Sequence, residues 1–170
     1  MSELIQLRLP TNENEGLELI SLVENPAHQR QWLTFGATQR VLCASDNEKQ
    51  WVSGVAMMPD TPIYRNSGGA EWYCIFSKAD ILEMMQRFML QNRGAKANIN
   101  HAIPTKNAYL IESYITDASR KQSAPEHFGA LPDGTWIVTY KITDVKLWQQ
   151  IKSGKLNGFS VEGLFETRDI

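Results

Sequence analysis

The stretch that tells most about this fold is Leu156-Asn157-Gly158-Phe159-Ser160-Val161-Glu162-Gly163, in which a serine lies between two glycines. Glycine has no Cβ, so the backbone around Ser160 can adopt positive φ or let another segment approach closely. Such freedom helps the hydroxyl of a nucleophile to reach a carbonyl carbon. A serine also needs a base within hydrogen-bond reach. His101, the last residue of the box Asn98-Ile99-Asn100-His101, has the best surroundings for that role.

Length and composition are those of a folded domain with a proper core. Of the 170 residues, 42% are hydrophobic, so we expect one domain over residues 1–170. The formal net charge is −2 and no basic run is present, which argues against a nucleic-acid partner. No window approaches a membrane span, and the first residues do not resemble an export signal. We therefore expect no membrane partner and synthesis in a cytoplasm.

Two cysteines, Cys43 and Cys74, lie in separate apolar, strand-like stretches and form no Cys-x-x-Cys pair. Reduced thiols are therefore the default, and a structural metal is not expected. Acyl transfer by a nucleophilic serine needs neither a metal nor an organic cofactor, so no cofactor is predicted. A cysteine hydrolase is a weaker hypothesis, because neither thiol has basic neighbours in the sequence that would lower its pKa.

Short strand-like runs outnumber the helical ones. They are rich in β-branched, aromatic and other apolar residues, and proline, glycine or polar turns bound them. The predicted strands cover residues 17–23, 41–44, 51–58, 71–76, 109–115 and 135–142. The strands at 41–44 and 51–58 are expected to form a hairpin across a polar turn. The polar stretch 117–133 is expected to be a long, functional loop.

The first predicted helix has clear local signals. Ser77 offers an N-cap oxygen, and Asp80 follows three residues later, as in a capping box. Gly94 is a suitable stop. Apolar residues recur at helical spacing between these signals, at Ile81, Met84, Met85, Phe88 and Met89.

A second predicted helix begins near Thr143-Asp144 and ends at Ser153-Gly154. It carries Val145, Trp148 and Ile151 on one side and leads directly into the strand of Ser160. Many strands and only two helices predict an α+β fold, with a curled or closed, mostly antiparallel sheet flanked by helices.

Six short sequence motifs together span most of the chain. They are Met58-Pro59-Asp60-Thr61-Pro62-Ile63-Tyr64-Arg65, Asn98-Ile99-Asn100-His101, Leu110-Ile111-Glu112-Ser113-Tyr114-Ile115, Gly134-Thr135-Trp136, Leu147-Trp148-Gln149-Gln150-Ile151-Lys152-Ser153-Gly154 and Gly158-Phe159-Ser160-Val161-Glu162-Gly163. Their order resembles that in the phage prohead maturation proteases. The chain is similar to the branch of these serine proteases found in tailed phages and defective prophages. This resemblance implies the fold of herpesvirus assemblin, a mostly antiparallel β-barrel flanked by a few helices.

The resemblance also implies an activity. Its members are serine endopeptidases that cleave the internal scaffold and other head proteins, and commonly themselves, during capsid maturation. Scaffold and major capsid proteins would then be the substrates, and the host cytoplasm, inside the prohead, would be the location. Related proteases often self-associate. The resemblance places the nucleophile at Ser160 and the general base at His101, in agreement with the residues themselves.

Two acidic residues compete for the third catalytic position. Glu112 is the preferred prediction, because it lies in an apolar strand-like run where a charged side chain is costly to bury unless paired. An acidic residue in a similar strand also follows the histidine box in other prohead proteases. Glu162 is the alternative, since period-two alternation places it on the same strand face as Ser160.

Two non-catalytic functions are also compatible with the sequence. One is a structural protein of the phage particle, and the other is a barrel whose edge captures an extended peptide by strand addition. The presence of both His101 and Ser160 favours the protease over the structural protein, which needs neither residue. A protease may also bind its substrate by strand addition, so only turnover separates it from a peptide-binding barrel.

Overall fold

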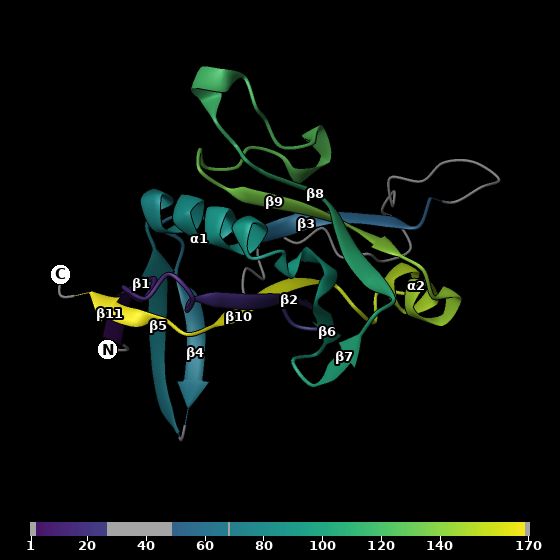
Figure 1. Cartoon of the computed structure of the whole chain (residues 1–170), viewed down its shortest axis with the longest axis horizontal. Coiled ribbons are helices and arrows are strands. Elements are labelled where there is room, and N and C mark those ends of the chain that lie inside the picture. The colour runs from purple at the N-terminus through teal and green to yellow at the C-terminus, as the bar shows by residue number, and fades with distance from the viewer. Residues whose placement is uncertain (1–2, 27–48, 68, 169–170) are drawn as a thin grey trace.

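The computed structural model describes residues 3–26, 49–67 and 69–168 (Figure 1). Over these residues the fold is α+β with two α-helices, as predicted, and the strands form three sheets rather than one. The three sheets stay open across the described residues, so the closed, assemblin-like barrel is not confirmed. The predicted strand at 41–44, and with it the predicted hairpin, lies outside the described residues.

The first sheet has the order β11-β1-β5-β4 and is formed by the two ends of the described chain and one hairpin. β1 pairs in parallel with β5, whereas its pairing with β11 and the β4–β5 pairing are antiparallel. Because β11 follows closely after β10, this sheet anchors the segment that leaves the strand of Ser160. The four strands are β1 (Glu3–Arg8), β4 (Ile63–Ser67), β5 (Ala70–Phe76) and β11 (Glu166–Arg168).

The second sheet, with the order β10-β2-β6-β7, carries the predicted nucleophile. β2 lies between β10 and β6, antiparallel to the first and parallel to the second. It therefore joins the strand of Ser160 to the strand that leads to His101, as the neighbouring ribbons in Figure 1 show. The strands are β2 (Leu17–Val23), β6 (Ala97–Ile99), β7 (Ile103–Thr105) and β10 (Gly158–Gly163).

The third sheet is antiparallel, with the order β3-β9-β8. Its central strand β9 is almost wholly buried, which matches its continuous apolar sequence. All three strands were predicted, apart from small shifts at their ends. They are β3 (Trp51–Met57), β8 (Ala108–Ile115) and β9 (Trp136–Ile142).

Helix α1 (Lys78–Leu90) forms as its local sequence predicts. Ser77 is the N-cap and makes a capping box with Asp80. Of the predicted apolar face, Ile81, Met84 and Phe88 are buried, whereas Met89 is half exposed. The helix ends at Leu90, and Gly94 lies in the short 3-10 helix that follows, Arg93–Ala95.

Helix α2 (Val145–Lys152) begins after Asp144, whose side chain accepts a hydrogen bond from the Leu147 amide. Leu147, Trp148 and Ile151 are buried, but Val145 is exposed, so its predicted place on the apolar face is wrong. At about 100° per residue, Val145 lies about 120° around the helix from Ile151, whereas Leu147 lies within about 40° of it. Leu147 therefore completes the apolar face.

The main core lies between α1, β9 and the inner faces of β2 and β10. The Phe88 ring packs edge-on against Trp136, with centroids 5.6 Å apart. The Tyr140 ring contacts Phe159, the residue before Ser160, at 5.3 Å. These contacts hold β10 against the core through its apolar face, so the opposite face is left for polar groups.

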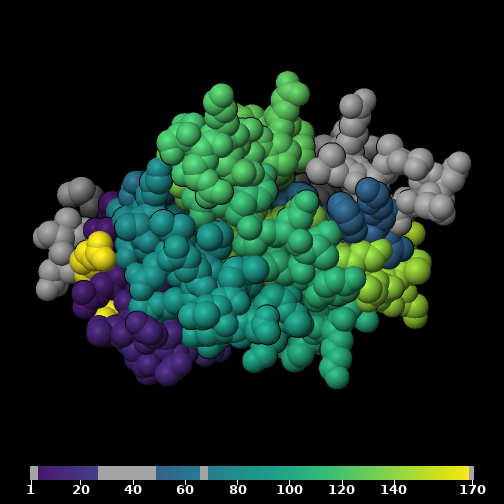
Figure 2. All heavy atoms as spheres, turned by 45° about the horizontal axis from the view of Figure 1, so that its top comes forward, coloured from purple at the N-terminus to yellow at the C-terminus, as the bar shows by residue number. Residues whose placement is uncertain are grey.

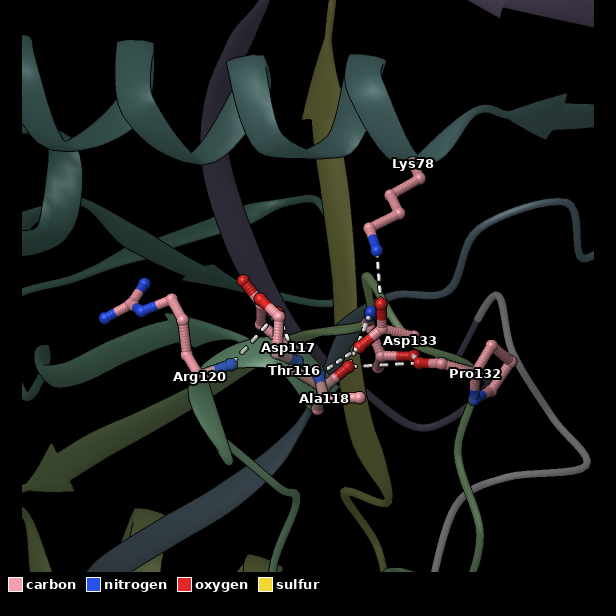
Figure 3. Close-up of polar contacts among 9 residues, drawn as sticks. Lys78, Thr116, Asp117, Ala118, Arg120, Pro132 and Asp133 are labelled. Atoms are coloured by element: carbon pink, nitrogen blue, oxygen red, sulfur yellow. Dashed lines mark hydrogen bonds and ion pairs between the residues drawn. The ribbon is translucent and has the colours of Figure 1, made fainter.

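The predicted loop at 117–133 connects β8 to β9 and is tied at its neck (Figure 3). The Thr116 amide donates to the Thr135 carbonyl at 2.8 Å, and the Thr116 hydroxyl donates to the Pro132 carbonyl at 3.0 Å. Asp133 forms an ion pair with Lys78 in the first turn of α1. In Figure 2 the loop is a green knob that projects from the surface, and in Figure 1 it lies at the opposite end of the view from the β6–β7 hairpin.

Candidate active site

Ser160 lies in the middle of a regular strand. Its neighbours Phe159 and Val161 are buried in the core, so Ser160 and Glu162 point to the opposite face of β10. Ser160 is 6% exposed and faces Ser21 of β2 in the strand register. The hydroxyl therefore belongs to a polar layer on one face of β10 and β2, and this layer is almost closed to solvent.

Gly163 ends this strand at a point of close backbone contact. A Cβ at this position would lie 2.2 Å from the Gly16 carbonyl oxygen and 2.7 Å from Leu17 Cα. The register also shifts between Glu162 and Gly163, as at a β-bulge. Of the two predicted reasons for glycine here, close approach is confirmed and positive φ is not, because Gly163 keeps a negative φ.

His101 lies in the tight turn between β6 and β7. Asn100 and His101 have φ values of 51° and 58°, and the Ala102 amide donates to the Ile99 carbonyl at 3.1 Å. Two central residues with positive φ are typical of a type I′ hairpin turn. Asn and His adopt left-handed φ more readily than most residues with a side chain, so both suit this turn.

Asn100 fastens this turn to the end of β2. The side-chain oxygen of Asn100 accepts a hydrogen bond from the backbone N–H of Glu24 at 2.9 Å. The backbone N–H of Asn100 donates to the Leu22 carbonyl, also at 2.9 Å. The imidazole of His101 is thereby carried to the same side of the sheet as the polar face of β10.

Glu162 is the residue on which this polar layer converges. Its Oε1 atom accepts hydrogen bonds from His101 Nδ1 at 2.7 Å, from Asn98 Nδ2 at 2.8 Å and from the Ser21 hydroxyl. Ser21 Oγ is also 3.2 Å from His101 Nδ1. One carboxylate oxygen therefore joins groups from β2, β6 and the β6–β7 turn.

These contacts fix the charge of Glu162. Burial alone raises the pKa of this carboxyl, but hydrogen bonds from Ser21, Asn98 and His101 outweigh burial and hold the pKa below its ordinary value of 4.5. Glu162 is thus ionised at neutral pH. A carboxylate next to Nδ1 favours the tautomer that carries its proton there, which leaves Nε2 free to accept a proton.

Glu112, the preferred third residue, lies elsewhere. It is exposed on β8, opposite Thr139 of β9, in the third sheet. The register shifts between Leu110 and Glu112, and the carboxylate stays in water, so it needs no buried partner. The structure thus brings Glu162, the alternative, to His101, and it does not bring Glu112 there.

Ser160 and His101 face the same layer, but no hydrogen bond joins them among the contacts of the described residues. Ser160, Ser21 and Asn98 lie side by side across β10, β2 and β6. Neighbouring strands are about 4.8 Å apart, so Ser160 is one strand away from the hydroxyl that touches His101. Catalytic hydrogen bonds are often long before substrate binds.

The other nucleophile and base candidates have different surroundings. Cys74 is buried, and its burial raises the pKa of the thiol, which opposes formation of a thiolate. His127 lies in the 117–133 loop, against the Phe128 ring at 4.1 Å. Within residues 3–26, 49–67 and 69–168, acidic, histidine and cysteine side chains form no group of three or more that could hold a metal ion. The helices of this part of the chain do not meet the length and hydropathy that a membrane span requires.

Comparison with known proteins adds an independent finding. Residues 38–169 match the model of the protein family described as "Putative phage serine protease XkdF". The chain belongs to this family. The family match includes Asn98, His101, Ser160 and Glu162, but it begins after β2 and so leaves out Ser21.

Two proteins of Bacillus subtilis strain 168 are similar to this chain. The phage-like element PBSX protein XkdF is 23% identical over 163 residues, which are 88% of this chain and 53% of the relative. The "Uncharacterized protein YqbD" is 23% identical over 162 residues, 91% of this chain and 46% of the relative. The chain thus spans about half the length of these relatives. No solved structure matches it.

The sequence analysis did not predict that Ser21 and Asn98 donate hydrogen bonds to the carboxylate of Glu162. A signal for Ser21 was present, because it is the one small polar residue inside the apolar run Leu19-Ile20-Ser21-Leu22-Val23. A lone hydroxyl in a buried strand has to find a partner.

Proposed function

We propose that this protein is a serine endopeptidase in which Ser160 is the nucleophile, His101 the general base and Glu162 the carboxylate that orients His101. The observation that carries the proposal is the 2.7 Å contact between Glu162 Oε1 and His101 Nδ1, on the strand face that also presents Ser160. The family description as a phage serine protease supports the same chemistry.

In the proposed reaction, Ser160 Oγ attacks the carbonyl carbon of a peptide bond while His101 Nε2 takes its proton. The imidazolium that forms is stabilised by the ionised Glu162. His101 then gives the proton to the leaving amine, and an acyl-enzyme on Ser160 remains. Water, deprotonated by His101, hydrolyses that ester and restores the free serine.

The proposed substrates are the internal scaffold and other head proteins of the phage, together with the protease itself. The setting would be the prohead during assembly in the host cytoplasm. Membership in a phage protein family supports this assignment. An assemblin-like arrangement of the sheets is part of the same proposal.

The test is cleavage of the phage's scaffold protein by purified wild type, Ser160→Ala and His101→Ala, followed by mass spectrometry of the products. Ser53→Ala is a suitable control, because Ser53 is a half-buried strand serine of the third sheet that bonds Thr139. Wild type and the control should cleave, whereas the two site variants should not. Equal cleavage by all four proteins would refute the assigned site. No cleavage by any, with the whole prohead supplied, would indicate a structural or peptide-binding role.

A further inference from the structure

Ser21 is a fully buried polar residue in the central strand of the second sheet. Its exposed fraction is 0%, and its neighbours Ile20 and Leu22 point into the core. A buried hydroxyl costs free energy unless it is hydrogen-bonded. The partners of Ser21 are Glu162 Oε1 and His101 Nδ1, two groups of the candidate site.

The position of Ser21 is as informative as its contacts. It faces Ser160 across the β2–β10 pairing and Asn98 across the β2–β6 pairing. The residues that carry the proposed chemistry come from β10 and from the β6–β7 turn, and β2 is the strand between them. Ser21 is therefore the point at which both halves of the site meet.

We propose that Ser21 is a positioning residue of this site: its hydroxyl donates to Glu162 Oε1 and holds that carboxylate on Nδ1 of His101. This inference rests on the proposed function. Glu162 has three side-chain torsions and is 30% exposed, so it could otherwise turn toward water. Ser21 and Asn98 donate from two different strands to the same oxygen and fix its place.

The direction of these hydrogen bonds also selects the histidine tautomer. The Ser21 proton goes to Glu162, so the Ser21 oxygen presents lone pairs to His101 Nδ1, 3.2 Å away. The two oxygens near Nδ1, Ser21 Oγ and Glu162 Oε1, then both act as hydrogen-bond acceptors toward His101, and a proton on Nδ1 serves them as donor. Nε2 is left without a proton in the neutral ring, as the general base requires.

Ser21 does not have the surroundings of a second nucleophile. It is fully buried, its proton is committed to a carboxylate, and it faces Nδ1, the nitrogen that carries the proton in this arrangement. Loss of cleavage in Ser21→Ala, with full cleavage by Ser160→Ala, would reverse the two assignments and overturn the proposal.

The test compares wild type, Ser21→Ala, Ser21→Cys and the control Ser53→Ala. The first readout needs no substrate: the side-chain carboxyl carbon of Glu162 is followed by NMR as the pH is varied. Removal of the Ser21 donor should raise the pKa of Glu162, whereas Ser53→Ala should leave it unchanged. Ser21→Cys keeps the shape of the side chain and a weak donor, although sulfur is larger than oxygen. It should give an intermediate shift, and it serves as the informative variant where Ser21→Ala does not fold.

The second readout is cleavage of the scaffold protein. We expect kcat to fall about 10- to 100-fold in Ser21→Ala with KM little changed, because a displaced base affects the chemical step. Identical titration of Glu162 in all four proteins would overturn the inference. If the pKa of Glu162 is raised in Ser21→Ala but the wild type cleaves nothing, the proposed function is overturned. The hydrogen bond from Ser21 to Glu162 would still be supported.

Discussion

Two glutamates on strands, Glu162 and Glu112, illustrate how different the second and third sheets are. Glu162 is half-buried on β10 and receives three hydrogen bonds on one oxygen. Glu112 is exposed on β8, in a strand whose partner β9 is mostly apolar. Both lie in apolar stretches of sequence, so hydrophobic context alone does not separate them. What separates them is that side chains of β2, β6 and the β6–β7 turn donate to Glu162, whereas the carboxylate of Glu112 stays in water.

The largest expected effect contrasts these two residues directly. Glu162→Gln should lower kcat for scaffold cleavage by roughly 10⁴-fold, because a neutral amide no longer fixes the histidine tautomer or stabilises the imidazolium. Glu112→Gln should leave kcat unchanged. The measurement is steady-state cleavage at neutral pH, and a strong loss in Glu112→Gln alone would restore the original third-residue prediction.

Gly163→Ala tests the backbone contact that ends β10. The added Cβ meets the Gly16 carbonyl and Leu17 Cα, both backbone atoms, so the strand has to move. We expect a loss of about 3 kcal/mol in the free energy of unfolding.

Denaturant unfolding of Gly163→Ala and of wild type measures this loss. A loss below about 1 kcal/mol would mean that β10 can shift at little cost.

His101→Gly and His101→Ala separate the strain of the turn from its chemistry. Both should abolish cleavage. Glycine accepts the φ of 58° without strain, so His101→Gly should be more stable than His101→Ala by about 1 kcal/mol. The comparison uses denaturant midpoints, and a more stable alanine variant would contradict the left-handed turn.

Acid stability should show the smallest effect. The pKa of Glu162 is lower in the folded protein than its ordinary value of 4.5, so its contribution to stability is complete above that value. The contribution disappears as the pH falls through the lower, folded-state pKa. Unfolding measured between neutral pH and pH about 3 should therefore show a weaker pH dependence in Glu162→Gln than in wild type.

The elements that sequence predicted well are those with local signals. Helix α1 formed between its capping box and its apolar repeat because both act within a few residues. The shared face of Ser160 and Glu162 followed from strand alternation alone. The contact between Glu162 and His101 depends on the parallel β2–β6 pairing and on the β6–β7 turn, which bring together segments distant in sequence.

Ser160 and Glu162 lie two residues apart on the same strand, β10, so one change of register affects both. A slip of β10 by one residue against β2 would turn both side chains into the core and bring Phe159 and Val161 out to the polar layer. The apolar packing of Phe159 and Val161 resists such a slip, and it therefore also keeps Ser160 and Glu162 on the polar face. Under the proposed function, a chain in which this register is incomplete would therefore be inactive, because both the nucleophile and the orienting carboxylate would be missing from the site.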